Sequence, residues 1–282
     1  MLKFGRFKIA ELSTGWQRLD GGAMFGVVPR PLWEKQIPPD DKNRIRLALR
    51  CLYVDTGDRK IVVDTGIGDK FSAKQNDIYG VDPSPGVTGA LRQQGVDPDA
   101  VTDVILTHLH FDHAGGATTR QADGTFAPTF ANATYHLQRR ALTWAQHPSE
   151  KDRASFRPDD WDALLEANRM HLVNGPCELF PGVSLIVSEG HTVAQQLVLV
   201  DGGAEQKIVY CGDVIPTAAH IPLPYIMGYD LYPLTTLEEK KMLLAQALEE
   251  RWWLFYEHDP NVAATRVNED GGRFVRGESL QF

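Results

Sequence analysis

Four metal-binding side chains lie within six positions of one another in the segment 107–113, directly after an apolar run that reads as a β-strand. They are His108, His110, Asp112 and His113. In an extended segment, side chains two positions apart point to the same face, so we expect the first three to project together. A turn after Asp112 would then bring His113 beside them. Because imidazoles and a carboxylate suit zinc, and also manganese or iron, the segment predicts a metal site.

The remaining ligands should follow other strands, because this cluster alone cannot complete two metal sites. Each ion needs three or more protein ligands and an open position for water. His191, Asp213 and His258 each follow an apolar, strand-like run. Gly115 and Gly116 come after the first cluster, and their lack of a side chain would let the backbone pack closely beside the ions. The predicted metal ligands are His108, His110, Asp112, His113, His191, Asp213 and His258.

Apolar runs and turn residues predict the elements that carry these ligands. Strands are expected at 1–12, 45–55, 60–64, 104–106, 133–137, 183–187, 196–200, 208–211 and 252–256. A helix is expected at 83–95, and the capping-box pattern at 236–239 predicts the start of another. Residues 138–172 read as a helical insertion, and 262–282 as a hairpin. Strands with helices between them indicate a layered α/β fold. Since no Gly/Ser or Pro linker divides the chain, we expect one domain over 1–282.

The order of the ligands resembles that of the metallo-β-lactamase fold superfamily, in which His-x-His-x-Asp-His is followed by His, Asp and His at strand ends. The resemblance covers essentially the whole chain and implies a four-layer αββα sandwich with two metal ions at the edge of its sheets. The superfamily pattern gives three ligands to each ion: His108, His110 and His191 to the first, and Asp112, His113 and His258 to the second. It implies that Asp213 bridges the ions. Asp64 matches an outer aspartate that orients a ligand histidine.

The resemblance also implies a chemistry for the site. Two divalent ions about 3.5–4 Å apart would hold a bridging water and lower its pKa toward neutrality. The hydroxide would attack an electrophilic carbonyl or phosphorus, while one ion polarises the oxygen under attack and the other stabilises the leaving alkoxide. Zinc is the expected metal, with manganese, iron or cobalt as alternatives. Asp112 and Asp213 are the expected catalytic carboxylates, and no serine or cysteine nucleophile is needed.

Four segments are similar to the quorum-quenching branch of this superfamily, the N-acyl homoserine lactone lactonases, which open the lactone ring of bacterial signals. They are 19–33, 108–116, 216–220 and 229–233. A lactone is a neutral ester, so an acidic protein needs no cationic site to bind it. The residues expected to line the substrate pocket are Met24, Phe25, Trp33, Ile226 and Tyr229. For His220, the expected role is a hydrogen bond to the substrate or support of a ligand, and the alternative is a surface or structural histidine.

One position departs from the pattern of better-known lactonases of this fold. Those enzymes carry a tyrosine three residues after the bridging aspartate, and it donates a hydrogen bond to the substrate. Pro216 occupies that position here. Tyr225, Tyr229 and Tyr232 are the candidates to replace the missing hydroxyl.

Other activities of the same fold are the alternatives. An organophosphate triesterase would use the same metals and a similar apolar pocket for a neutral substrate. A glyoxalase II-like thioesterase would need a basic C-terminal region, for which Arg266, Arg273 and Arg276 are the candidates. The complete ligand set argues against a non-catalytic metal-binding scaffold. His110 argues against iron-based oxygen chemistry, which usually has a glutamate there.

Composition narrows the partners of the chain. Its 282 residues include 29 Lys and Arg against 37 Asp and Glu, a net charge of −8 with no basic stripe, so nucleic acid is not expected to bind. No apolar run approaches the ~20 residues that cross a bilayer, so no membrane contact is expected. Three cysteines without CxxC spacing and the lack of a signal peptide predict a cytoplasmic protein. The expected partner is a small-molecule ester. A homodimer through the N-terminal loop is a hypothesis from the resemblance, which a monomeric mass in light scattering would contradict.

Overall fold

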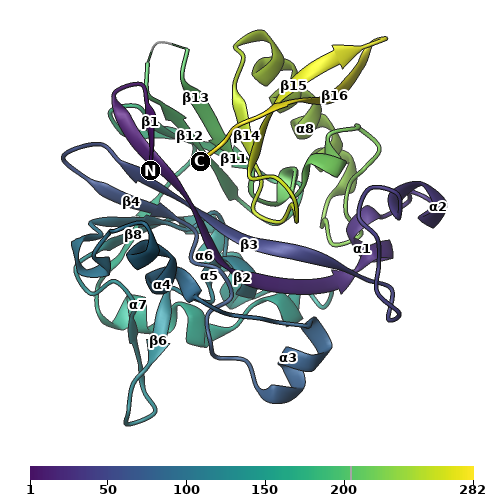
Figure 1. The fold of residues 1–282 in the computed structure, drawn as a ribbon. Helices are drawn as coiled ribbons and strands as arrows, with labels where there is room; N and C mark the ends of the chain where they lie inside the picture. The colour runs from purple at the N-terminus through teal and green to yellow at the C-terminus, as the bar shows by residue number, and fades with distance from the viewer. Residues whose placement is uncertain (204) are drawn as a thin grey trace.

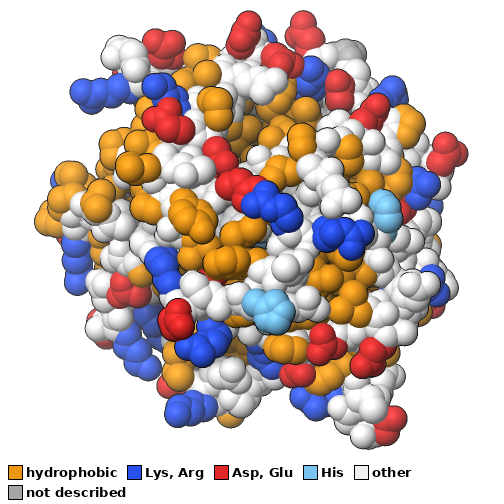
Figure 2. Space-filling model, turned by 180° about the vertical axis from the view of Figure 1, so that it is seen from behind, with side chains coloured by type: hydrophobic (Ala, Val, Ile, Leu, Met, Phe, Trp, Pro, Cys, Tyr) orange, Lys and Arg blue, Asp and Glu red, His pale blue; other side chains and the backbone are white. Residues whose placement is uncertain are grey.

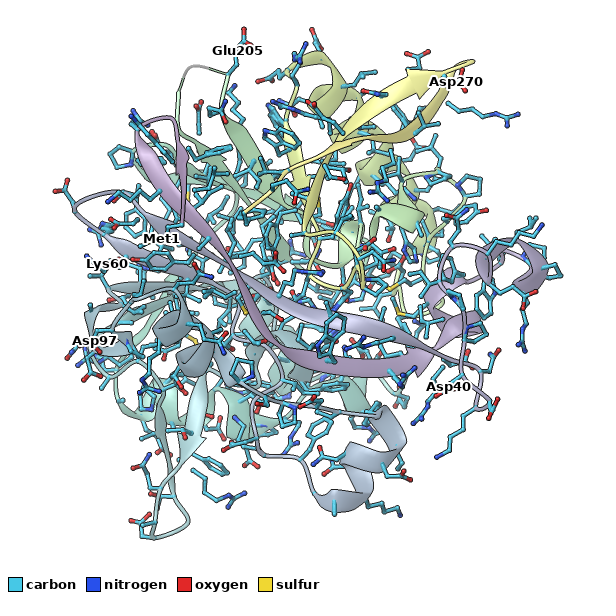
Figure 3. All side chains as sticks on the ribbon, in the orientation of Figure 1. Met1, Asp40, Lys60, Asp97, Glu205 and Asp270 are labelled. Carbon is cyan, nitrogen blue, oxygen red and sulfur yellow. The ribbon has the colours of Figure 1, made fainter. Side chains whose placement is uncertain are left out.

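Two stacked β-sheets with helices on their outer faces make up the fold (Figure 1). This computed structural model describes residues 1–203 and 205–282. The expectation of a four-layer αββα sandwich is confirmed. Side chains fill the space between the layers, and the labelled charged residues lie at the periphery (Figure 3).

The first sheet has seven strands in the order β1-β2-β3-β4-β5-β8-β9. Its first four strands pair antiparallel, whereas β4, β5, β8 and β9 run parallel. The strands are β1 (Leu2–Phe4), β2 (Phe7–Asp20), β3 (Arg44–Asp55), β4 (Lys60–Val63), β5 (Asp103–Ile105), β8 (Thr134–Gln138) and β9 (Met170–Val173). A separate hairpin consists of β6 (Thr118–Arg120) and β7 (Phe126–Pro128).

The second sheet contains the remaining seven strands in chain order, from β10 to β16. All neighbours pair antiparallel except β13 and β14, which are parallel and are joined through helix α8. The strands are β10 (Cys177–Phe180), β11 (Val183–Ser188), β12 (Gln195–Asp201), β13 (Lys207–Tyr210), β14 (Trp253–Phe255), β15 (Ala264–Asp270) and β16 (Arg273–Ser279).

Helices cover the two outer faces, with α4, α6 and α7 against the first sheet and α8 against the second (Figure 1). The α-helices are α1 (Gly21–Phe25), α2 (Arg30–Trp33), α3 (Ala73–Tyr79), α4 (Gly86–Gln93), α5 (Phe111–Ala114), α6 (Arg139–Gln146), α7 (Asp162–Glu166) and α8 (Pro233–Glu249). The short 3-10 helices are η1 (Pro98–Ala100), η2 (Arg153–Ser155), η3 (Pro158–Asp160), η4 (Gly212–Val214) and η5 (Ala218–His220).

The alternation of side chains along each strand produces the layers. On β3, Leu52 and Val54 belong to the core between the two sheets, whereas Cys51 and Tyr53 pack in the core under α4 and α6. On β14, Leu254 packs under α8, on the other side of the second sheet from its neighbours. Because both faces of these strands are covered, nearly all of their residues are buried and apolar side chains occur on both faces.

The predicted helical insertion at 138–172 needs new bounds. Gln138 is the last residue of β8, and residues 170–172 belong to β9, which extends the first sheet. The residues between them are helical only in short pieces, α6, η2, η3 and α7. Both ends of the segment are therefore strands of the scaffold, and only its middle is a connection across the site.

The predicted capping box at 236–239 is wrong. Helix α8 begins at Pro233, and the Thr236 hydroxyl donates to the Tyr232 carbonyl from within the helix. The Glu239 carboxylate instead accepts hydrogen bonds from the Ser188 hydroxyl at 2.6 Å and from the Glu189 amide at 2.9 Å. A tertiary contact thus takes the carboxylate that a capping box would use.

Other predicted elements are present with shifted ends. The first strand is a hairpin, in which Gly5 and Arg6 separate β1 from β2, and β2 continues to Asp20. Helix α4 is shorter than the predicted 83–95, and the C-terminal hairpin is present as β15 and β16.

The surface carries charges of both signs. On the face shown in Figure 2, acidic and basic side chains are interspersed among hydrophobic patches. Among the described residues, no helix is both long and apolar enough to span a bilayer.

Candidate metal centre

The seven predicted metal ligands come together at one edge of the sandwich and all are buried. Three of them come shortly after a strand ends: His108 follows β5, Asp213 follows β13 and His258 follows β14. His191 lies in the connection from β11 to β12. The side chains form two groups whose ligand atoms lie within 4.8 Å of one another: His108, His110, His191 and Asp213 in one, and Asp112, His113 and His258 in the other.

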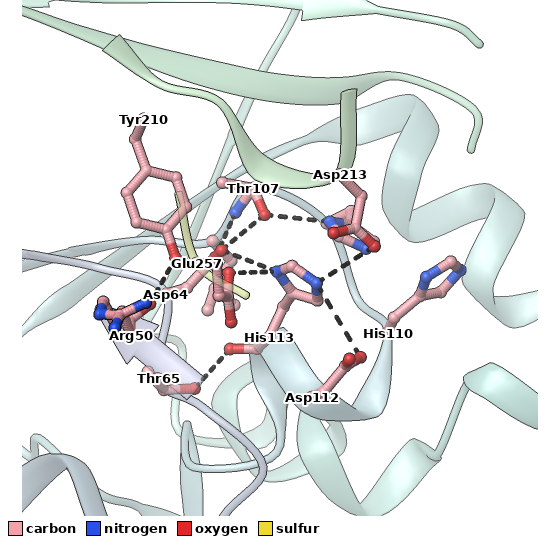
Figure 4. A network of polar contacts seen from close by, with 12 residues as sticks. Arg50, Asp64, Thr65, Thr107, His110, Asp112, His113, Tyr210, Asp213 and Glu257 are labelled. Atoms are coloured by element: carbon pink, nitrogen blue, oxygen red, sulfur yellow. Dashed lines mark hydrogen bonds and ion pairs between the residues drawn. The ribbon is translucent and has the colours of Figure 1, made fainter. Parts of the chain in front are cut away.

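Asp213 belongs to the first group and also contacts the second. Its Oδ2 is 3.2 Å from His191 Nε2 in the first group and 3.5 Å from His113 Nε2 in the second. Its Oδ1 is 3.3 Å from His258 Nε2. Figure 4 shows the contact between Asp213 and His113. One carboxylate therefore reaches ligands of both groups, as a bridging ligand must.

The local conformation of the first cluster differs from the predicted one. The chain is extended only to His110, the N-cap of α5, so Asp112 and His113 already lie in a helical turn. A Cβ on Gly115 would lie 2.2 Å from the Ile67 carbonyl oxygen, and one on Gly116 would lie 2.2 Å from that of Thr65. These glycines are needed for packing of α5 against the 65–67 loop, and not for an approach of the backbone to metal ions.

Several buried polar atoms at the site have no partner among the described residues. His108 Nε2 and His110 Nε2 make no hydrogen bond there, and Asp213 Oδ1 has only its ion-pair contact with His258 Nε2. Because buried polar atoms are almost always paired, such a group of orphans needs an explanation. Divalent cations would supply the missing partners, and the nitrogen and carboxylate donors present suit zinc.

The electrostatics of the site also fit cations. Burial would raise the pKa of Asp213, but His113, His191 and His258 hold it well below its usual value. Burial would lower the pKa of His258, yet Asp213 and further carboxylates raise it to about 9. Without metal, protons on histidines must balance the buried carboxylates. Bound cations would remove that need and leave the imidazoles neutral.

The second nitrogen of most ligand histidines is fixed by an outer partner. His191 Nδ1 is 2.9 Å from Asp230 Oδ1, and His258 Nδ1 is 2.9 Å from the Ala48 carbonyl oxygen. His108 Nδ1 is 3.0 Å from the Thr107 hydroxyl. Such contacts set the ring orientation and leave Nε2 available for the metal.

Asp64 is one of two carboxylates at His113. Its Oδ2 is 3.0 Å from His113 Nδ1, and it accepts hydrogen bonds from the Thr107 amide and hydroxyl, both at 2.7 Å. Its φ of 57° lies in the left-handed region, which aspartate tolerates better than most residues. This is the position of an outer residue that orients a ligand, as the resemblance implied.

Glu257 is the second carboxylate at His113. Its Oε2 is 2.8 Å from His113 Nδ1 and accepts the hydroxyl proton of Tyr210 (Figure 4). Burial raises its pKa to about 7, partly offset by His113. Asp64, His113 and Glu257 are close enough to form a third metal-binding group. However, both carboxylates are occupied by protein donors and face the nitrogen opposite to the one near Asp213, so we interpret them as orienting residues.

Sequence reasoning missed three outer residues. Gln17, on β2, donates from Nε2 to Asp112 Oδ2, and Asp230 and Glu257 contact His191 and His113. Glu257 directly precedes the predicted ligand His258, and a carboxylate at that place in the sequence could have been recognised as part of the site. Gln17 and Asp230 come from segments without a metal-binding motif, and only the tertiary fold brings them to the site.

Replacing Asp230 with asparagine is expected to weaken binding of the metal ion held by His191. The amide cannot supply the negative charge that makes the imidazole a stronger ligand, and loss of such partners typically costs about 10–100-fold in metal affinity or activity. Competition with a chromophoric chelator would measure the change. Two unchanged metal affinities would contradict the orienting role of Asp230.

A cavity of about 230 Å³ opens over the ligands. Two residues of the predicted substrate pocket, Met24 and Tyr229, line it. The remaining lining residues are Leu19, Tyr79, His110, Phe111, Asp112, Lys151, Asp152, Ala154, Ser155, His191, Asp213, Met227 and His258. The other three predicted pocket residues do not line it. Phe25 and Trp33 are stacked in a separate core at a ring distance of 5.4 Å, and Ile226 lies outside the lining.

The predicted participation of His220 is also corrected. His220 is fully buried, with Nε2 2.8 Å from the Met24 carbonyl oxygen and Nδ1 2.7 Å from the Thr217 hydroxyl. Its ring is stacked on Phe25 at 4.6 Å. Burial lowers its pKa to about 3, so it is neutral. Both nitrogens are used within the protein, which makes His220 a structural residue next to the cavity.

His220→Ala is therefore expected to destabilise the fold without removing activity. Losing a buried ring and its hydrogen bonds should lower the free energy of unfolding by about 2–4 kcal/mol. The kcat, measured well below the unfolding temperature, should stay within about 3-fold of wild type, because the ligand set is intact. A loss of kcat without a loss of stability would restore the catalytic role.

Comparisons with known proteins agree with this site. The sequence profile described as the metallo-beta-lactamase superfamily matches residues 49–258. An N-acyl homoserine lactonase of Bacillus cereus is 24% identical over 229 residues, which cover 77% of this chain and 83% of the relative. A probable metal-dependent hydrolase from Staphylococcus aureus superposes with a TM-score of 0.89 at 29% identity, covering 99% of this chain and all of the other.

A further structure shares the fold at lower identity. The dizinc quorum-quenching lactonase AidC, solved with an N-hexanoyl-homoserine product, has a TM-score of 0.80 at 17% identity, covering 100% of this chain and 97% of the other. The superfamily match spans most of the chain and includes all seven ligands. The chain therefore belongs to the metallo-beta-lactamase superfamily and is a metal-dependent hydrolase.

Proposed function

We propose that this hydrolase opens the lactone ring of N-acyl homoserine lactones. The observation that carries the proposal is the cavity over the ligands, which combines apolar walls with two phenols. Leu19, Met24 and Met227 provide flexible apolar contacts for an acyl chain. Lactonases named for this substrate are among the curated relatives.

The charge of the cavity suits a neutral substrate. Lys151 is the one basic side chain other than histidine among the described lining residues, and its ammonium group already donates to three backbone carbonyls. No lysine or arginine among the described lining residues is therefore free to bind an anionic substrate. An uncharged ester can enter without the desolvation of an ion.

Two tyrosines are available in place of the residue that Pro216 replaces. Tyr229 and Tyr79 both line the cavity, and burial and the charge of Asp112 raise the pKa of each phenol, so both remain protonated donors. Tyr225 and Tyr232 do not line it. We assign the hydrogen bond to the substrate to the phenol of Tyr229 or Tyr79.

The reaction adds one water across the ester bond. Two divalent ions, when bound by the seven ligands, supply an acidified water and polarise the ester carbonyl. The water oxygen bonds to the carbonyl carbon, the ring C–O bond breaks, and the freed alkoxide takes a proton to give N-acyl homoserine. In this chain, Asp213 links the two ligand groups, and Gln17 holds Asp112 in place by its hydrogen bond.

The two alternative activities, an organophosphate triesterase and a glutathione thioesterase, differ in the charge that their substrates require at the cavity. A phosphotriester is also neutral, so an organophosphate triesterase is the second candidate on the same site. A glutathione thioester would need basic residues at the cavity. Arg266 packs over Trp253 at 4.0 Å, and Arg276 lines a different cavity, so the predicted arginines do not serve this one.

Hydrolysis of a substrate panel tests the proposal. The zinc- or manganese-loaded enzyme is given N-acyl homoserine lactones of short and long chains, paraoxon and a glutathione thioester. Lactone opening at kcat/KM of ~10⁴ M⁻¹s⁻¹ or more is expected, a value usual for a true substrate. Negligible lactone turnover beside robust cleavage of paraoxon or the thioester would reject the lactonase proposal without contradicting the assignment of the metal centre.

A further inference from the structure

Lys151 connects two walls of the cavity. It lies in the connection between α6 and η2. Asp152 of this connection and Ala154 and Ser155 of η2 line one wall. Its ammonium group donates to the carbonyl oxygens of Gly228, Tyr229 and Asp230, at 3.1, 2.7 and 3.0 Å. These three consecutive residues belong to the opposite wall, where Met227 and Tyr229 face the cavity.

The geometry uses the full donor capacity of the lysine. An ammonium group has three N–H donors, and each has one carbonyl acceptor here. Hydrogen bonds with an ionised partner are roughly twice as strong as neutral ones. Side chains of described residues form no ion pair with Lys151, so its attachment depends on the path of the 228–230 backbone.

The same backbone segment is joined to a metal ligand. Asp230 contacts His191 Nδ1 at 2.9 Å, and its Oδ2 accepts a hydrogen bond from the Met227 amide at 3.2 Å. The Leu231 amide donates to the His191 carbonyl at 3.0 Å. One edge of the 227–231 segment is thus fixed at the metal centre, and Lys151 holds the other edge from across the cavity.

We propose that Lys151 is a positioning residue that holds the Met227–Tyr229 wall against the connection after α6 and thereby sets which acyl chains the cavity accepts. It acts through the 228–230 carbonyls, since its own donors are already occupied. This inference rests on the proposed lactonase function only for its acyl-chain readout. The contact between the two walls is independent of the substrate.

Lys151→Met tests the inference, since methionine keeps an apolar stem of similar length and removes all three donors. Lys241→Met is the matched control. Lys241 is exposed on α8, and its side chain makes no hydrogen bond or ion pair with any described residue. Both variants are compared with wild type as metal-loaded enzymes, with metal content measured first.

Hydrogen exchange is the readout that needs no substrate. In Lys151→Met, amides of 225–232 and 148–156 should exchange at least ~10-fold faster than in wild type, because the segments lose their mutual anchor. Lys241→Met should match wild type in both segments. Unchanged exchange in Lys151→Met would overturn the proposed contact, whatever the substrate is.

Steady-state kinetics is the second readout. KM for the preferred lactone should rise at least ~5-fold while kcat changes less than ~3-fold, because substrate binding is loosened and the metal ligands stay in place. The ratio of kcat/KM between short- and long-chain lactones should fall at least ~5-fold toward unity. Faster exchange with an unchanged chain-length ratio would overturn the role in selectivity. Absence of lactone turnover in wild type itself would reject the proposed function and leave the exchange result to stand alone.

Discussion

Asp213→Ala is expected to abolish hydrolysis and to release at least one metal ion per chain. Among the described residues, Asp213 is the one carboxylate that reaches ligands of both groups, at 3.2 Å from His191 and 3.3 Å from His258. Losing an outer partner of a metal ligand already costs about 10–100-fold, so loss of the shared ligand should cost more than ~100-fold in kcat/KM. Turnover and metal content of the purified variant measure the two effects.

The control for this variant is an aspartate far from the site. Asp58 is exposed in the connection between β3 and β4, and Asp58→Ala should retain both metal ions and full turnover. Retention of both ions with normal turnover in Asp213→Ala would rule out the bridging role. Loss of metal from both variants alike would point to a preparation effect.

Metal removal is expected to destabilise the protein, and more so as the pH rises. In the metal-free protein, burial of His258 would lower its pKa, but the surrounding carboxylates raise it to about 9. Burial raises the pKa of Glu257 to about 7. Both values exceed those of the unfolded chain, near 6.5 and 4.5. A group with a raised pKa stabilises the fold below its unfolded pKa, and this contribution is lost as the pH rises through the folded pKa.

Thermal unfolding of metal-loaded and metal-free protein at pH 6.5 and pH 9 measures this effect. The metal-free protein should lose stability over that interval, whereas bound cations replace the protons in the loaded protein. The gap in Tm between the two forms should therefore widen by roughly 4 °C or more, corresponding to 1–2 kcal/mol in a protein of this size. A gap that is constant or narrows with rising pH would contradict the account of the buried charges.

The sequence could predict which side chains come together at the candidate metal centre, because their chemistry is visible in it. The segment 107–113 concentrates metal-binding side chains that have no role in an apolar core. His191, Asp213 and His258 interrupt apolar runs at the places where strands end. The length and apolar character of those runs predicted the layers, because strands covered on both faces bury nearly all of their side chains.

The surroundings of the ligands could not be predicted in the same way. Gln17 and Asp230 each contact a candidate metal ligand that is 95 or 39 residues away in the sequence, respectively. Glu239 looked like a capping residue, yet its carboxylate holds the loop before His191. Local sequence patterns report interactions between neighbouring residues. In each of these cases a contact with a residue distant in the sequence determines what the side chain does.

The substrate pocket was predicted least well for a related reason. Phe25 stacks on both Trp33 and His220 beside the cavity, because large rings gain more from mutual burial than from lining an open space. Tyr79 lines the cavity from the end of α3, a segment that carried no functional pattern. Which apolar residues face a cavity depends on the packing of several segments, and no single segment encodes it.

Anomalous diffraction from crystals of the zinc-loaded protein is the most direct test of the metal centre. Two peaks are predicted on either side of Asp213, one bounded by His108, His110 and His191 and the other by Asp112, His113 and His258. A single peak, or a peak between Asp64, His113 and Glu257, would contradict the assignment of ligands on which the proposed hydrolysis depends.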